Sequence, residues 1–237
     1  LQSDCCQGRD RCIETNNGVG WALERKLENF KVIKIQKQFC FDLIEQSHYL
    51  KRLPSIMYAF GLYNRNDLVG ACTFGSPPSL NLCEGVCGKE FKDEVLELNR
   101  LFLVNNEKNL ASFFVSRALK MLPKPSIIVS YADKTNGHCG YVYQATNFIY
   151  TGLSEKRTDL KTDTGLHSRT EWRNKKEGEV REYVERPRKH RYIYFTGSKA
   201  ERKLRRQKLN YKILGYPKTD NENYDVDYIP SLQPLLI

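Results

Sequence analysis

The stretch SIIVSYADKTNGHCGYVYQATNF, residues 126–148, decides the fold class. Its first eight residues form an apolar run that ends in an acid, as a buried strand does. Residues 140–147 then predict a short helix, and residues 148–157 predict the next strand. An acid, two glycines, a histidine, a cysteine and two tyrosines gather where the first strand ends. Because functional groups collect on the loops that a rigid scaffold positions, this stretch is the first candidate site.

Strand and helix patterns continue on both sides of this stretch. Strands are expected at 30–36, 95–104 and 192–197, a hairpin around NRND at 55–75, and helices at 37–50, 109–122 and 198–211. This order predicts an α/β protein with a mixed β-sheet flanked by helices. The order resembles that of GNAT-type acyltransferases, so the expected core is GNAT-like.

Length and composition are those of a globular chain. The chain has 237 residues, of which 40% are hydrophobic. No apolar run approaches the roughly 18–20 residues that span a bilayer, and the polar N-terminus lacks the apolar segment of a secretory signal. We therefore expect a cytoplasmic protein without a membrane partner. We divide it into an N-terminal extension (1–30), a GNAT-like core (31–160), and a basic C-terminal extension and tail packed on the core (161–237).

Eight cysteines raise the question of disulfides or zinc. In a cytoplasmic chain reduced thiols are the stronger expectation. Cys83 and Cys87 are separated by three residues and have no second pair at a matching distance, so zinc binding competes with simple burial as small apolar residues.

The net charge of +10 is concentrated in one region. Residues 155–218 hold 20 Lys and Arg against 9 Asp and Glu, while the rest of the chain is nearly neutral. A concentrated basic region favours a polyanionic partner, with nucleic acid as the leading candidate and a solvated charged face as the alternative.

Polar residues near the predicted strand 95–104 are candidates for binding a co-substrate. Arg100 and Asn99 interrupt an otherwise apolar strand, so Arg100 needs an anion to bind or an ion pair with Glu97 or Asp133. In GNAT enzymes the CoA pyrophosphate binds at the next helix N-terminus. Ser112 and Asn109 occupy that place here, but the usual glycine-rich loop is missing.

Seven segments together resemble the Mom family of phage DNA-modification proteins. The resemblance runs from about Phe39 to Phe195, and the segments read SHYLKRLPSIMYAFGLY, LVGACTFGSPPS, CEGVCG, ELNRLFL, SIIVSYAD, GHCGYVYQATNFIYTGLSEKRT and RPRKHRYIYF. The resemblance implies a GNAT-like transferase. It would convert adenine in double-stranded DNA to N6-carbamoylmethyladenine, which protects DNA from host restriction nucleases. It implies a small-molecule donor without identifying it: an acyl-CoA and a bound iron are both open.

Under this hypothesis, an extruded adenine must be stacked and its amino group hydrogen-bonded. Asp133 can accept an N6 proton or act as a base, and Tyr131 and Tyr143 can stack or hydrogen-bond. The alternatives are a turn or helix-cap role for Asp133 and core packing for Tyr143.

Histidines beside the candidate site supply further catalytic or metal-ligating groups. His138 follows a glycine close to Asp133, and His48 and Tyr49 lie together at the end of a predicted helix. His48, Tyr49 and Asp133 are candidate ligands of a non-haem iron, although no two-histidine spacing indicates a metal.

Residues of the basic region are expected to contact DNA phosphates without reading sequence. They are Lys156, Arg157, Arg186, Arg188, Lys189, His190, Arg191, Arg202, Arg205 and Arg206. Two other functions stay open, namely a GNAT acyltransferase for a small amine or protein and a non-enzymatic DNA-binding module. A homodimer is also left open.

Overall fold

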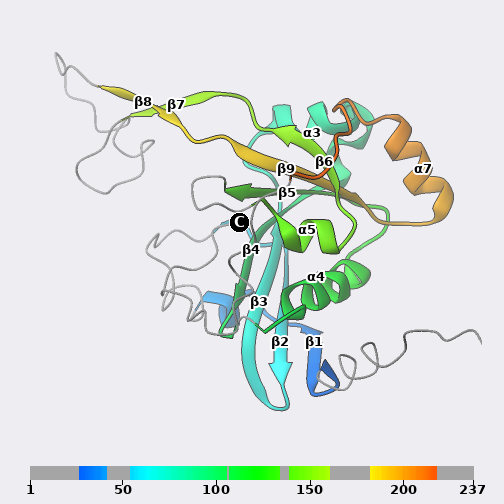
Figure 1. The fold of residues 1–237 in the computed structure, drawn as a ribbon. Coiled ribbons are helices and arrows are strands. Elements are labelled where there is room, and N and C mark those ends of the chain that lie inside the picture. Colours follow the sequence, from blue (N-terminus) through cyan, green and yellow to red (C-terminus); the bar gives the residue numbers. More distant parts are fainter. Residues whose placement is uncertain (1–26, 42–53, 106, 134–138, 161–181, 218–237) are drawn as a thin grey trace, which may run out of the picture.

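The computed structural model describes residues 27–41, 54–105, 107–133, 139–160 and 182–217. Within this part of the chain, seven strands form one sheet in the order β1-β2-β3-β4-β5-β9-β6 (Figure 1). The pairing of β4 with β5 is parallel, and all other neighbours in the sheet are antiparallel. The strands are β1 Phe30–Lys34, β2 Tyr58–Asn64, β3 Asp67–Gly75, β4 Val95–Leu103, β5 Ile127–Asp133, β6 Ile149–Leu153 and β9 Lys189–Phe195.

Helices cover both faces of the sheet (Figure 1). We call one the α4 face, because α4 (Leu110–Met121) and α5 (Tyr141–Ala145) pack there on the larger hydrophobic core. The other is the α3 face, where α3 (Leu80–Cys87) packs on a smaller core. The 3₁₀ helix η1 (Lys89–Glu94) and helix α7 (Lys199–Gln207) also lie on this side. The predicted fold class, a mixed α/β sheet flanked by helices, is confirmed.

Local sequence explains most of these elements. The apolar runs became β4 and β5, and the NRND hairpin became β2 and β3. Helix α7 begins with a capping box, in which Ser198 and Glu201 each bond the other's backbone N–H. None of the helices in the described ranges is long and apolar enough to cross a membrane.

Strand β9 differs from the expected one. The sequence predicts a final strand only from Tyr192, after a charged and turn-rich segment, but β9 begins at Lys189. It lies between β5 and β6, so the residues after 160 complete the sheet. The charges at the start of β9 are tolerated because each has a partner: Lys189 pairs with Asp133, and Arg191 bonds Thr151.

Two short strands outside the sheet form a separate ribbon. Strand β7 (Arg157–Leu160) pairs antiparallel with β8 (Tyr183–Arg186), where the sequence predicts only a charged segment. This β7–β8 ribbon continues the β6–β9 pair beyond the edge of the sheet (Figure 1).

Candidate active site on the α3 face

Strands β4 and β5 pair over only part of their length. The parallel pairs join Val95–Glu97 with Ile127–Val129, although β4 continues to Leu103 and β5 to Asp133. Beyond these pairs, the C-terminal parts of the two strands are no longer each other's partners. Ligands in α/β proteins bind beyond the carboxyl ends of parallel strands, so this is where a site is expected.

Polar side chains gather on the α3 face at these strand ends. Antiparallel pairing sets Asp133 opposite Lys189 and Tyr131 opposite Arg191, and parallel pairing sets Glu97 beside Val129. Residues in register share a face, and Val129 belongs to the α3-face core. Glu97, Tyr131, Asp133, Lys189 and Arg191 therefore form one group, which we call the strand-end cluster.

Asp133 forms an ion pair within this cluster. Its Oδ2 lies 3.2 Å from Nζ of Lys189, and the two side chains are only 16% and 26% exposed. An ammonium group at this distance stabilises the charged form of a carboxylate. Asp133 is therefore held in place as a charged carboxylate, which can accept hydrogen bonds.

Glu97 is a second carboxylate of the cluster. Burial raises the pKa of Glu97 above its ordinary value, and the neighbouring Lys189 and Arg100 cations lower it by less. Lys189 thus acts on both carboxylates. Sequence reasoning considered Glu97 only as an ion-pair partner for Arg100 and Lys189 only as a DNA contact. An acid within an apolar strand was the available signal for Glu97.

Tyr131 lies between Glu97 and Arg191. Burial raises the pKa of Tyr131 well above its ordinary value, and the Arg191 cation opposes this shift. Its phenol is therefore protonated at neutral pH and can both donate and accept a hydrogen bond. Arg191 is held in place by Thr151, whose Oγ1 accepts from Nε at 2.9 Å, and stacks 3.4 Å above the Tyr211 ring.

Asn99 and Arg100 have structural partners at the middle of β4. The Asn99 side chain accepts a hydrogen bond from Thr73 at 2.6 Å and donates one to the Ser55 carbonyl at 2.8 Å. Arg100 donates to the Asn99 carbonyl at 2.7 Å and lies close enough to Glu97 to act on its pKa. The amide of Asn99 is thus used within the fold, while Arg100 adds a cation beside the cluster.

Tyr143 lies on the opposite face of the sheet from Tyr131. Its ring is 1% exposed and packs between Phe148 and Tyr192, with ring centroids 5.2 Å away in each case. Burial raises the pKa of its phenol, which lies near the Ser130 hydroxyl. This is the core packing considered as an alternative, and the two tyrosines do not form the two sides of one stacking site.

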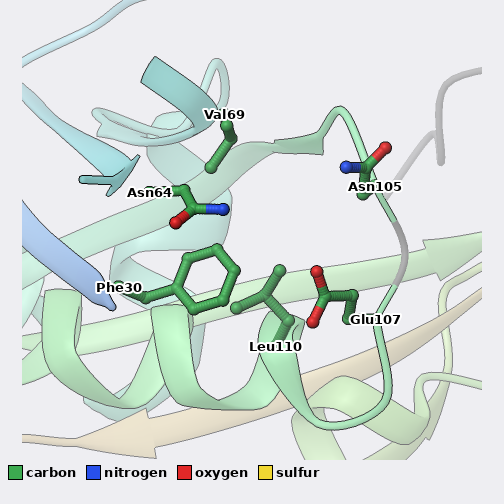
Figure 2. A pocket seen from close by; sticks show the side chains of 6 residues that line it. All are labelled: Phe30, Asn64, Val69, Asn105, Glu107 and Leu110. Carbon is green, nitrogen blue, oxygen red and sulfur yellow. The ribbon is translucent and has the colours of Figure 1, made fainter. Parts of the chain in front are cut away.

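Asn109 ends the turn between β4 and α4, and Ser112 lies in the first turn of α4. The Ser112 hydroxyl donates to the Asn109 carbonyl at 3.0 Å, and Asn109 has a positive φ of 65°. A pocket beside this turn has room for about one water, ≈ 10 Å³. Figure 2 shows its lining, which includes the Glu107 carboxylate and the apolar Leu110. Among the described residues of this turn, an acid and a serine hydroxyl that already donates to a backbone carbonyl do not form a phosphate-binding site.

Two residues predicted to contact DNA are buried instead. Arg205 is 5% exposed and donates twice to the Glu94 carboxylate, both at 2.6 Å, so it fastens α7 to η1. His190 is 8% exposed, and its Nδ1 lies 2.8 Å from the Tyr150 hydroxyl. The prediction of phosphate contacts for these two residues is wrong, because long-range partners on the sheet and on η1 hold them inside the fold.

Other basic residues divide between structure and surface. Arg188 donates to the Ser154 carbonyl at 2.6 Å, where the β7–β8 ribbon joins the sheet, and Lys189 and Arg191 belong to the strand-end cluster. The Arg186 side chain lies outside the described residues. The exposed basic side chains predicted to bind DNA are Lys156, Arg157, Arg202 and Arg206.

Comparison with known proteins identifies the family of this chain. The family model of the Mom protein family matches residues 29–218, which include every strand of the sheet. This chain belongs to the Mom protein family. A Mom relative, the methylcarbamoylase mom of Escherichia phage Mu, is 28% identical over 206 residues, which cover 79% of this chain and 85% of the relative.

Solved structures similar to this Mom-family chain include acetyltransferases. NAA60 of Arabidopsis thaliana in complex with acetyl-CoA has 10% identity and a TM-score of 0.45, covering 70% of this chain and 99% of that one. A GNAT-family acetyltransferase of Bacillus cereus has 14% identity and a TM-score of 0.39, covering 71% of this chain and 99% of that one.

The remaining candidate residues of this Mom-family chain are those predicted to bind a metal ion. His48, Tyr49 and His138 lie outside the described residues. Within the described ranges, no three His, Cys, Asp or Glu side chains are grouped to hold a metal ion. The described residues therefore leave the iron hypothesis untested, and we derive no step through iron. Cys83 and Cys87 are free thiols that pack in the α3-face core.

Proposed function

We propose that this Mom-family chain is a transferase that converts adenine in double-stranded DNA to N6-carbamoylmethyladenine. Modified phage DNA would then resist host restriction nucleases in the cytoplasm of the infected cell. Family membership and the relative named methylcarbamoylase support a group transfer of this kind. The observation that carries the proposal is the strand-end cluster, where a carboxylate held by a lysine lies at the C-terminal end of a parallel strand pair.

The chemistry requires help at the adenine amino group. The N6 lone pair is delocalised into the ring, so the base must leave the duplex stack and meet a hydrogen-bond acceptor. Asp133 accepts a hydrogen bond from the N6–H group. It takes the proton as a new N–C bond forms between N6 and the donor's methylene carbon. The donor's bond to that carbon breaks, and its electron pair stays with the leaving group. Lys189 limits the cost of holding charge on Asp133.

Two neighbouring residues would orient the reactants. The protonated Tyr131 phenol can bond a ring nitrogen of the base or an oxygen of the donor. Arg100 can bind a carbonyl or an anionic group of the donor beside Glu97. The described residues of the β4–α4 turn form no phosphate-binding site, so we assign the donor only as a small molecule that carries a carbamoylmethyl group.

The DNA backbone would be held by exposed cations of α7. Lys199, Arg202, Lys203 and Arg206 are exposed on a helix that directly follows β9, the strand that carries Lys189. Phosphate contacts of this kind give affinity without sequence preference. Base choice is then left to the strand-end cluster.

Digestion of plasmid DNA by restriction nucleases tests this function. We expect that plasmid from bacteria expressing this chain resists nucleases whose recognition sites contain adenine. Nucleases with only G and C in their sites should cut as before, because they do not meet the modified base. Plasmid from cells expressing Asp133→Ala is the control and should be cut by both groups. Full cutting of the wild-type sample by both groups would contradict the proposal.

A further inference from the structure

We propose that the β7–β8 ribbon lies in a groove of duplex DNA beside the target base and makes binding selective for double strands. The inference rests on the proposed function, because it assigns to this ribbon a part in DNA recognition. It adds a surface that the strand-end cluster and α7 do not supply.

The ribbon projects from the edge of the sheet (Figure 1). It continues the β6–β9 pair, and Arg188 fastens its base by donating to the carbonyls of Ser154 and Leu153 at 2.6 and 3.5 Å. A Lys189 N–H bond to Ser154 Oγ, at 3.0 Å, closes the same junction. The ribbon is therefore held firmly where it leaves the molecule.

The described side chains of the ribbon are exposed on both strands. Tyr183 is 62% exposed and Val184 is 44% exposed, and the Lys156 and Glu185 side chains are 74% and 62% exposed. A two-stranded ribbon is at best marginally stable alone in water, and each face of β8 exposes one of these apolar side chains. Both observations favour a partner that covers the ribbon.

Shape and position make duplex DNA the partner that fits. The major groove is about 12 Å wide and admits a two-stranded β-ribbon. The ribbon lies within the segment of residues 155–218, which carries 20 Lys and Arg against 9 Asp and Glu. Only two residues separate β8 from Lys189, the partner of Asp133. A duplex that contacts the ribbon would thus pass the strand-end cluster.

The length of extended chain between the ribbon and Lys189 sets the distance from the DNA contact to the strand-end cluster. Tyr183 stands six residues before Lys189, which corresponds to roughly 20 Å at about 3.3 Å per residue. At about 3.4 Å per base pair, Tyr183 would meet the duplex some six base pairs from the target. The ribbon would therefore bind flanking duplex, and a different group would handle the extruded base.

Charges on the ribbon nearly cancel, so its contribution differs from that of α7. Lys156 pairs with Glu185 across the strands at 3.8 Å, and Glu182 adds another acid. Exposed cations of α7 can hold the backbone of single-stranded and double-stranded DNA alike. A groove exists only in the duplex, so contacts of the ribbon would add affinity for the duplex alone.

Binding of labelled oligonucleotides to the full chain tests the inference. We would measure dissociation constants by fluorescence anisotropy for a duplex of about 30 base pairs and for one of its strands. Val184→Glu should weaken duplex binding about tenfold, because it brings a negative charge into the groove. Single-strand binding should change less than twofold. Val184→Lys should instead tighten duplex binding.

The matched control is Met121→Glu on α4, because Met121 is 45% exposed and Val184 is 44% exposed. The ribbon proposal is overturned if wild type binds the duplex and neither Val184 variant differs from this control. It is also overturned if the variants change self-association in sedimentation but leave duplex affinity intact. Wild-type protein that binds no DNA would overturn the proposed function itself.

Discussion

At the scale of single residues, long-range partners decide what a basic side chain does. Arg205 and Arg206 are neighbours in the same basic run, yet Arg205 is buried against Glu94 and Arg206 is exposed. The Arg205 guanidinium also lies 5.3 Å from the centre of the Phe91 ring. The first of these arginines therefore holds α7 in place, and the second is available to DNA.

We predict that Arg205→Ala destabilises the fold and that Arg206→Ala does not. Removal of Arg205 leaves the Glu94 carboxylate without its cation, at a cost of about 3 kcal/mol in the free energy of unfolding. The Arg206 substitution should change this free energy by less than about 0.5 kcal/mol. Urea unfolding measures both values. Equal effects of the two substitutions would show that the Arg205–Glu94 ion pair is not a structural link.

We also predict that Glu97 makes stability depend on pH. Burial raises its pKa above the ordinary value of 4.5, so the folded chain binds this proton more tightly than the unfolded chain. The contribution of Glu97 is fully present below 4.5 and is lost as pH rises through the folded pKa. The Tm of Glu97→Gln relative to that of wild type should therefore rise between about pH 4 and about pH 8, because the neutral amide has no proton to lose.

Thermal unfolding at a series of pH values measures this difference. Glu107→Gln, at an exposed glutamate, is the control and should follow wild type. If the Tm of Glu97→Gln had the same pH dependence as that of wild type, ionisation of the Glu97 carboxylate would not destabilise the fold.

At the scale of elements, α7 presents its cations on one exposed surface while Arg205 faces inward. Its capping box defines where the helix begins, and Arg205 fixes it to η1. A surface held in this way can bind phosphates without being ordered first, so its binding should have the salt dependence of simple charge neutralisation.

We predict that Arg202→Gln with Arg206→Gln lowers the salt dependence of DNA binding. Each lost phosphate contact reduces the slope of log K against log salt by about 0.9, so the double variant should lose close to two. Lys120→Gln with Lys124→Gln removes two exposed cations from the α4 side and should leave the slope unchanged. Equal slopes for the two double variants would exclude α7 as the phosphate-binding surface.

The elements also show what sequence could predict. Strands such as β5 and the β2–β3 hairpin were predictable, because apolar runs and turn residues are local signals. Helix α3 was missed: it is short, follows two prolines and contains Gly85. The start of β9 was missed because its charges are compensated by residues on other strands.

The candidate site was predictable only in part. Asp133 and Tyr131 follow from an acid and a tyrosine at the end of an apolar strand. The roles of Lys189 and Glu97 depend on which strands are neighbours, and the burial of Arg205 depends on Glu94, which is 111 residues away. No local pattern contains that information, because pairing between distant segments is set by the whole fold.

At the scale of the whole molecule, the proposed catalytic cluster and the proposed DNA-binding elements share one continuous structure. Strand β9 carries Lys189 of the strand-end cluster, the β7–β8 ribbon precedes it, and α7 follows it. The basic segment is therefore part of the sheet. DNA held by α7 and the ribbon would be positioned relative to Asp133 by the rigidity of the sheet itself.

Quantification of modified deoxyadenosine in plasmid DNA tests the central claim most directly. Nucleosides from cells expressing wild type, Asp133→Asn or Asp93→Asn would be compared by mass spectrometry, after confirming that each protein is folded. Asp93 is exposed on η1 and provides the same substitution away from the cluster. Deoxyadenosine with the mass of an added carbamoylmethyl group should appear with wild type and Asp93→Asn, and fall at least about 100-fold with Asp133→Asn. Wild-type levels with Asp133→Asn, or no modified deoxyadenosine with any of the three proteins, would contradict the account.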